Sequence, residues 1–271
     1  MELQLNNGTA IPQLGFGVFR AQDGTETESA VRWALEAGYR HIDTAKIYGN
    51  EVSVGRALRD SGLPREKVFL TTKLWTKDVR AKRTRQAFEE SLEALQTDYL
   101  DLYLIHWPAE GFAQAWAEME QLYWDGRVRA IGVSNFHRHH LEELSRTAQI
   151  QPMVNQIESH PYLTNQPLIN YCQGQGITVE VWSPLGGGKA NLLEDQTILT
   201  LAQKYNRTPA QIVIRWHLQR GVAVMPKSVH QERIISNRQV FDFTLLDEDM
   251  DVIQKLNCDL RVGSDPDNFT F

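Results

Sequence analysis

Residues 68–73 read VFLTTK, a short apolar run that ends on a lysine. Four other apolar runs also end on polar groups: 39–43 on an acid, 103–106 on an imidazole, and 131–135 and 153–156 on amides. A short apolar run with a polar end is typical of a buried parallel strand. Such groups at successive strand ends are expected of an α/β barrel, whose mouth is built from the ends of all its strands.

Helical periodicity separates these runs along the chain. Further strands at 14–18, 177–182 and 222–225 bring the count to eight. Helices are expected at residues 26–37, 51–61, 80–95, 112–123, 138–147, 167–173, 198–205 and 209–218. Strands that alternate with helices form right-handed βαβ units and a parallel sheet. We therefore predict an α/β fold, a (β/α)8 TIM barrel that forms a single domain over residues 1–271.

The N-terminal segment has the pattern of a small hairpin. Asn6-Asn7-Gly8 lies between two short apolar pieces, and an Asn-Gly pair in this setting favours a tight turn. We expect this β-hairpin to lie at the barrel floor. The length of 271 residues agrees with one barrel of about 250 residues.

Composition narrows the class of partner. The net charge of −6 argues against a general affinity for nucleic acid or an anionic membrane. No apolar stretch approaches the roughly 20 residues of a spanning helix, and the first residues do not resemble a signal peptide. Cys172 and Cys258 match no metal-binding spacing and are expected to be free thiols. These features predict a cytoplasmic protein without a nucleic-acid or membrane partner.

Asp43, Tyr48, Lys73 and His106 are the candidate reactive group. A buried lysine needs a carboxylate beside it or loses its charge, and Asp43 can supply one. Tyr48 follows Asp43 in the next loop, where a nearby ammonium is expected to lower the phenol pKa below about 10. Tyr48 would then donate a proton, and His106 would orient a substrate oxygen. The alternative is a purely structural Lys–Asp pair with a packed tyrosine and a core histidine.

Two other chemistries use the same region. His41 and Asp43 share one strand face and, with His106 and His160, could hold a metal in a hydrolase. Lys73 could instead form a Schiff base in an aldolase. Neither explains the whole pattern, because a cation does not need Lys73 and a Schiff base does not need Tyr48.

A second group follows the last strand. Lys227 and Ser228 come directly after it, and Arg233 and Asn237 lie on the short helix expected next. Barrels of this class often bind phosphate after strands seven and eight, and arginine and lysine suit an anion. The alternative is a solvated basic surface.

Aromatic residues follow several strand ends. Phe19, Trp75 and Trp107 are expected to wall a substrate pocket, whereas Trp182 could stack on a flat ring.

Several motifs occur in a fixed order over most of the chain. They are GYRHIDTA (38–45), YGNE (48–51), TTKLW (71–75), YLDLYLIHWP (99–108), IGVSNF (131–136), NQIE (155–158) and MPKS (225–228). Together they resemble the aldo-keto reductases, and most of all the prokaryotic 2,5-diketo-D-gluconate reductase branch. The resemblance implies NADPH-dependent reduction of aldehydes or ketones to alcohols by a monomer. An NADPH-binding regulatory or structural protein on the same fold is the alternative.

The resemblance also implies roles for individual residues. Asp43, Tyr48, Lys73 and His106 would be the catalytic tetrad, with hydride passing from NADPH to the carbonyl carbon and Tyr48 protonating the oxygen. The implied cofactor contacts are Ser134, Asn135, Gln156, Trp182, Ser183, Leu185, Lys227, Ser228, Arg233 and Asn237. Trp182 stands where the family usually has tyrosine. The segments after Pro108 and before Phe271 are short, which predicts an open substrate pocket.

Overall fold

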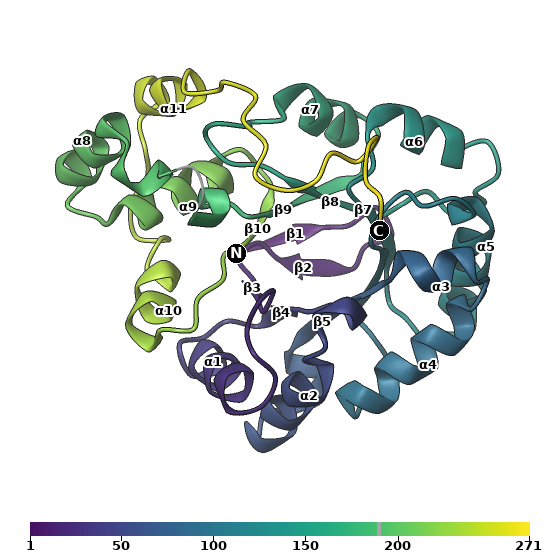
Figure 1. Cartoon of the computed structure of the whole chain (residues 1–271). Coiled ribbons are helices and arrows are strands. Elements are labelled where there is room, and N and C mark those ends of the chain that lie inside the picture. The colour runs from purple at the N-terminus through teal and green to yellow at the C-terminus, as the bar shows by residue number, and fades with distance from the viewer. Residues whose placement is uncertain (189–190) are drawn as a thin grey trace.

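The computed structural model describes residues 1–188 and 191–271, and its centre is a closed parallel barrel (Figure 1). Each strand pairs with its neighbours in chain order, and a bridge from Leu14 to Val224 joins the two ends of the sheet. The eight strands among these residues are β3 (Phe16–Gly17), β4 (His41–Asp43), β5 (Phe69–Leu74), β6 (Leu102–Ile105), β7 (Ile131–Ser134), β8 (Val154–Glu158), β9 (Thr178–Trp182) and β10 (Ala223–Met225). The predicted (β/α)8 barrel is confirmed.

Helices surround the strands on the outside of the barrel (Figure 1). The α-helices are α1 (Thr25–Glu36), α2 (Glu51–Asp60), α3 (Thr76–Arg80), α4 (Thr84–Leu95), α5 (Phe112–Trp124), α6 (Arg138–Leu144), α7 (Gln166–Gly174), α8 (Gln196–Tyr205), α9 (Pro209–Gln219), α10 (Gln231–Arg238) and α11 (Asp247–Gln254). Their apolar faces are buried in the core, as Ala30, Val31 and Ala34 of α1 are. No helix within the described residues is long and apolar enough to cross a membrane.

One predicted helix is wrong in its extent. The segment predicted as a single helix at 80–95 forms the end of α3 and then α4, with a break at residues 81–83. Lys82 adopts a left-handed conformation with φ of 54°, and the Arg83 amide donates to the Asp78 carbonyl. No glycine marks this break, so the sequence carries no local signal for it.

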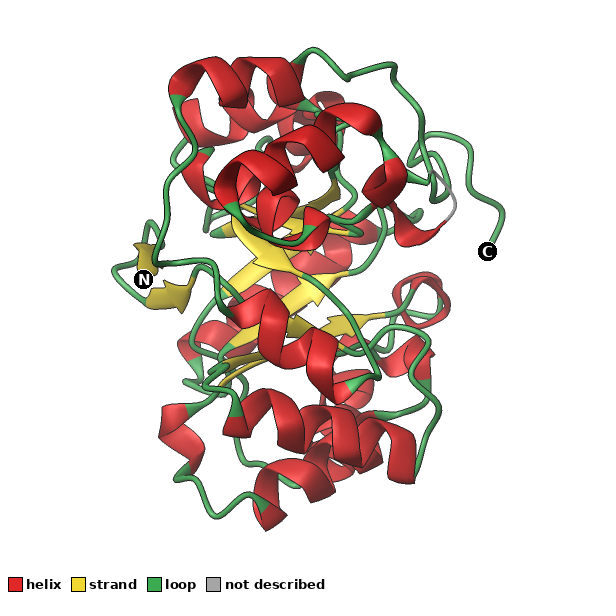
Figure 2. Ribbon diagram, turned by 90° about the vertical axis from the view of Figure 1, so that its left-hand side faces the viewer, coloured by secondary structure: helices red, strands yellow, loops and turns green. Residues whose placement is uncertain are grey.

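The N-terminal hairpin covers one end of the barrel. Strands β1 (Glu2–Gln4) and β2 (Ala10–Pro12) pair antiparallel. Asn6 donates to the Pro152 carbonyl at 3.2 Å and Asn7 to the Arg129 carbonyl at 2.9 Å, both just before barrel strands begin. The hairpin therefore lies at the barrel floor, as predicted. Figure 2 shows it on the side of the molecule opposite the C-terminal end.

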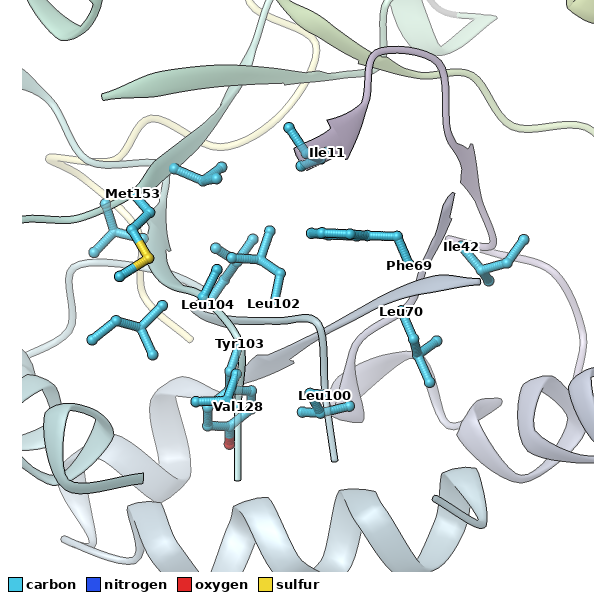
Figure 3. Packing of buried hydrophobic residues seen from close by; sticks show 14 of the residues in the cluster. Ile11, Ile42, Phe69, Leu70, Leu100, Leu102, Tyr103, Leu104, Val128 and Met153 are labelled. Atoms are coloured by element: carbon cyan, nitrogen blue, oxygen red, sulfur yellow. The ribbon is translucent and has the colours of Figure 1, made fainter. Parts of the chain in front are cut away.

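Strand alternation sorts side chains between the barrel interior and the helices. Ile42 and Leu70 are fully buried and belong to the large apolar core that includes Ile11 of the hairpin (Figure 3). The alternate residues meet inside the barrel, where His41 Nε2 lies 2.9 Å from Thr71 Oγ1. Continuing this alternation toward the strand ends brings Asp43 and Lys73 to the mouth.

Candidate active site

A buried ion pair lies at the ends of β4 and β5. Lys73 Nζ is 2.6 and 2.7 Å from the two Asp43 carboxylate oxygens and donates to the Thr44 carbonyl at 2.8 Å. The Lys73 side chain is fully buried. Burial alone lowers the pKa of Lys73, but Asp43, Tyr48 and Glu180 together outweigh it and raise that pKa above its ordinary value. Lys73 is therefore a fixed positive charge.

Tyr48 and His106 lie beside this pair. Tyr48 ends the short 3₁₀ turn Lys46–Tyr48, and its ring centroid is 5.2 Å from Lys73 Nζ. The Tyr48 and His106 rings meet edge to face with centroids 5.7 Å apart. The structure therefore brings all four predicted tetrad residues together at the mouth of the barrel.

The predicted direction of the Tyr48 pKa is wrong. Burial raises the pKa of Tyr48 to about 12, and the Lys73 ammonium opposes this effect without reversing it. The nearby Asp43 carboxylate adds to the rise because it disfavours a phenolate. The phenol of the free protein is thus a stable proton carrier at neutral pH.

His106 is neutral in this environment. Burial, together with the positive charge of Lys73, lowers the pKa of His106 well below its ordinary value. Asn135 Nδ2 donates to the His106 carbonyl at 3.0 Å and so holds the backbone at this strand end. A neutral imidazole at the mouth can donate one hydrogen bond to an oxygen placed near Tyr48.

The predicted amide group forms a second connected set. Trp182 Nε1 donates to Asn135 Oδ1 at 2.9 Å, and Asn135 Nδ2 donates to Ser134 Oγ at 3.1 Å. Ser134 Oγ in turn donates to the Gln156 carbonyl at 3.0 Å. Gln156 Nε2 donates to Asp43 Oδ2 at 2.8 Å. This last bond joins the amide set directly to the ion pair.

Sequence reasoning missed Glu180, a carboxyl beneath the tetrad. It is fully buried on β9 and accepts a hydrogen bond from Gln156 Nε2, while its second oxygen lies 3.9 Å from His41 Nε2. Burial and the neighbouring Asp43 carboxylate raise the pKa of Glu180 to about 8. The alternation TVEVW places Glu180 on the same strand face as Trp182, and this was the available signal.

The predicted anion group lines a cavity of about 690 Å³, a volume within the range of ligand sites. Lys227, Ser228, Arg233 and Asn237 contribute to its wall together with Leu185. Burial lowers the pKa of Lys227. Ser183, also a predicted cofactor contact, has a left-handed φ of 49° just before this wall. A second hollow against α4, lined by Glu89, Glu93, Asp98 and Arg127 among others, contains none of the predicted residues.

Aromatic side chains surround Tyr48 and His106. Phe19 contacts Tyr48 with ring centroids 5.0 Å apart, and Trp75 contacts His106 at 5.2 Å. Trp107 is buried and packs instead against two C-terminal residues that the sequence interpretation did not include, Phe269 and Phe271.

The C-terminal tail adds a wall to the mouth. Phe271 stacks on Trp75 with centroids 5.3 Å apart, and Arg80 donates to the Phe271 carbonyl at 2.9 Å. Upstream, the buried Glu158 carboxylate accepts hydrogen bonds from the Val262 and Gly263 amides. The prediction of an open pocket did not include this wall, because a tail without periodicity gives no signal of where it packs.

The metal alternative for the tetrad region does not fit the geometry. Both Asp43 oxygens are bonded to Lys73, and His160 Nε2 bonds Glu158 at 3.1 Å. Among the described residues, His41, Asp43, His106 and His160 do not gather into a ligand set.

Comparison with known proteins identifies the family. Residues 13–258 match the model of the Aldo/keto reductase family. The chain is 52% identical to the 9,11-endoperoxide prostaglandin H2 reductase of Trypanosoma cruzi (strain CL Brener), covering 98% of this chain and 94% of that protein. It is 51% identical to the glyoxal reductase of Bacillus subtilis (strain 168), covering 99% and 97%.

A solved structure agrees over the whole barrel. The aldo-keto reductase MGS-M4, from a Medee basin deep-sea metagenome library, superposes with a TM-score of 0.96 at 45% identity, covering 99% of this chain and 100% of that one. Together, the strand-end site, the family match and the structural similarity show that this chain belongs to the aldo/keto reductase family.

Proposed function

We propose that this protein reduces small aldehydes and ketones to alcohols with NADPH, using Tyr48 as the proton donor. The observation that carries the proposal is the buried Lys73–Asp43 pair beside Tyr48 and His106. A fixed ammonium next to a phenol stabilises the phenolate that remains after proton donation. A structural ion pair alone would not require a phenol and a neutral imidazole at the same opening.

The cavity beyond β10 supports binding of a phosphorylated dinucleotide. Lys227 and Arg233 line it, and within the described residues neither has a carboxylate at salt-bridge distance. Two unpaired cations in a hollow of this size suit a phosphate group. Trp182, the Ser134 hydroxyl and the side-chain amides of Asn135 and Gln156 would hold a nicotinamide. A reduced nicotinamide held there would supply a hydride, a proton with two electrons, for the carbonyl carbon.

The residues of the chain would divide the remaining work. His106 Nε2 would hold the carbonyl oxygen, and the hydroxyl of Tyr48 would transfer its proton to that oxygen as negative charge develops. An alkoxide is far more basic than a phenolate, so a phenol with a pKa near 12 still donates to it favourably. Lys73 then stabilises the phenolate until water restores the proton, while Asp43 keeps Lys73 charged and in position.

The test is NADPH consumption with small carbonyl compounds. Glyoxal belongs in the panel because the Bacillus relative is named a glyoxal reductase. Tyr48→Phe should lower turnover by about 10²- to 10⁴-fold while NADPH binding stays near normal. Tyr123→Phe is the matched control, because that hydroxyl lies at the floor beside Asn7. Full activity in Tyr48→Phe would refute the assignment.

Other outcomes address the remaining parts of the proposal. Tight NADPH binding without consumption of any carbonyl would favour a binding protein instead. The proposal includes a monomer acting in the cytoplasm on a small-molecule substrate, and light scattering of the purified chain would test the monomer.

A further inference from the structure

A cluster of histidines lies outside the proposed reductase site. His137, His139 and His140 follow β7 at the start of α6, and their ring nitrogens converge on Asp267 of the C-terminal tail. The four candidate ligand atoms all lie within 4.8 Å of one another. None of these side chains belongs to the tetrad or lines the cavity formed by Lys227 and Arg233.

Four of the distances among these atoms are close to those of a tetrahedral metal centre. Asp267 Oδ2 is 3.0 Å from His137 Nδ1, and Asp267 Oδ1 is 3.1 Å from His139 Nε2 and 3.5 Å from His140 Nε2. His139 Nε2 and His140 Nε2 are 3.1 Å apart. Bonds of about 2.0–2.1 Å to a tetrahedral ion give ligand–ligand distances of roughly 3.3 Å. The four atoms all lie within 4.8 Å of one another, so a single ion could draw them together by side-chain rotation at this exposed surface.

We propose that His137, His139, His140 and Asp267 form a zinc site that fastens the C-terminal tail to the β7–α6 segment. Three imidazoles and one carboxylate suit Zn²⁺, whereas Mg²⁺ and Ca²⁺ prefer sites made only of oxygen ligands. The ligand side chains range from 12% to 59% exposed, so an ion can enter from solvent. The guanidinium of Arg138, between His137 and His139 in the chain, is bonded to Glu142.

One ligand, His140, must move its ring proton from one nitrogen to the other before it can bind a metal. His140 Nδ1 accepts a hydrogen bond from the His137 amide at 3.1 Å, which leaves the imidazole proton on Nε2. Metal binding through Nε2 moves this proton to Nδ1 and gives up that hydrogen bond. The His137 amide and His140 Nδ1 must then separate, because both would be donors, and the loss of this one neutral hydrogen bond is far smaller than the free energy of binding a structural zinc ion.

Zinc binding at Asp267 would also affect the mouth of the barrel, because the tail continues from there to the aromatic wall. Asp267 comes two residues before Phe269, which packs on Trp107, and four before Phe271, which stacks on Trp75. Upstream, Glu158 already holds the tail at Val262 and Gly263. Figure 1 shows the chain after α11 running along the β9 and β8 side of the barrel and then beside α6 before it ends. A zinc ion at Asp267 would fix the tail at a second point and hold the aromatic wall in place.

The first experiment measures binding to the full chain without a histidine tag. Equilibrium dialysis should find one Zn²⁺ per chain, and Co²⁺ should give the intense visible absorption of a four-coordinate ion. His139→Gln and Asp267→Asn should each weaken Zn²⁺ binding by at least about tenfold. Glu142→Gln is the matched control, because it removes a carboxylate from the same surface without removing a ligand.

Two results would overturn the site. One is no stoichiometric binding by the wild-type chain, and the other is equal affinity in Asp267→Asn and Glu142→Gln. Thermal unfolding of the variants without metal checks that they fold.

A second measurement tests the fastening of the tail. Amide hydrogen exchange of residues 263–271 should slow when Zn²⁺ is added to the wild-type chain and stay unchanged in Asp267→Asn. Bound Zn²⁺ with unchanged exchange in the wild-type tail would refute the fastening. NADPH-dependent turnover is not needed for either readout.

Discussion

Glu180 gives the stability of this protein a specific dependence on pH. In the unfolded chain a glutamate has a pKa of 4.5, whereas burial and Asp43 raise the pKa of Glu180 to about 8 in the folded chain. Between these values the folded state binds a proton that the unfolded state has released. Stability from this group is therefore fully present below pH 4.5 and is lost as the pH rises toward 8.

The size of the effect follows from the same two values. The free energy of unfolding should fall by up to about 1.4 kcal/mol for each pH unit, or on the order of 5 kcal/mol across the window. Glu180→Gln cannot ionise and should lack this decline. His41 acts in the opposite direction, because burial lowers its pKa to about 3, but it is present in both proteins. The difference between the two stability curves therefore isolates Glu180.

The assay is urea unfolding without cofactor, followed by tryptophan fluorescence between about pH 5 and 9. Wild type should lose stability relative to Glu180→Gln as the pH rises from about 5 to about 8, and the difference should level off above that. Glu66→Gln, at an exposed position, controls for the removal of a carboxylate. Parallel curves for wild type and Glu180→Gln would show that Glu180 ionises in the folded chain near its ordinary pKa, and the reasoning from burial would fail.

Three other predictions concern the cofactor, the barrel wall and the proton donor. Arg233→Ala should weaken NADPH by at least about tenfold more than NADH in a binding titration, and equal losses would contradict a phosphate contact. Gly132→Ala places a Cβ 2.6 Å from the Val154 carbonyl and should destabilise the chain by about 1–3 kcal/mol in urea, whereas Gly174→Ala meets no atom within 4 Å and should be neutral or stabilising. Because the pKa of Tyr48 is about 12, its phenol stays protonated at neutral and mildly alkaline pH. The ratio kcat/KM for reduction should therefore show no loss from Tyr48 ionisation between about pH 7 and 9. A fall centred near about pH 8 that disappears in Tyr48→Phe would count against this.

The strand-end pattern was a sufficient basis for predicting the barrel and the proximity of the reactive groups. Asp43 and Lys73 meet because parallel strands present their carboxyl ends at one edge, a rule that needs no coordinates. The direction of the Tyr48 pKa shift could not be predicted, because it depends on whether burial of the ring outweighs the charge of Lys73. The sequence shows the charge but not the depth of burial. The break between α3 and α4 at Lys82 could not be predicted either, because its left-handed backbone conformation has no glycine to mark it.

Contacts between residues far apart in the sequence also could not be predicted. The segment 137–140 reads HRHH, but Asp267 is 130 residues away in sequence and lies in a tail without periodicity. Glu158 belonged to a quoted motif, yet its role in holding the tail depends on where the last residues pack. Residues that act through such contacts are found only when the path of the chain is known.

The closure of the barrel also has a consequence for folding. Gln13 Nε2 donates to the Leu218 carbonyl at 2.7 Å, a contact between residues 205 positions apart. Strands β4 and β5 can pair as soon as both have been synthesised, but this seam forms only when β10 emerges. A nascent chain interrupted before β10 would already contain Asp43, Lys73 and His106. It would lack the eighth strand, which closes the barrel that shields them from water.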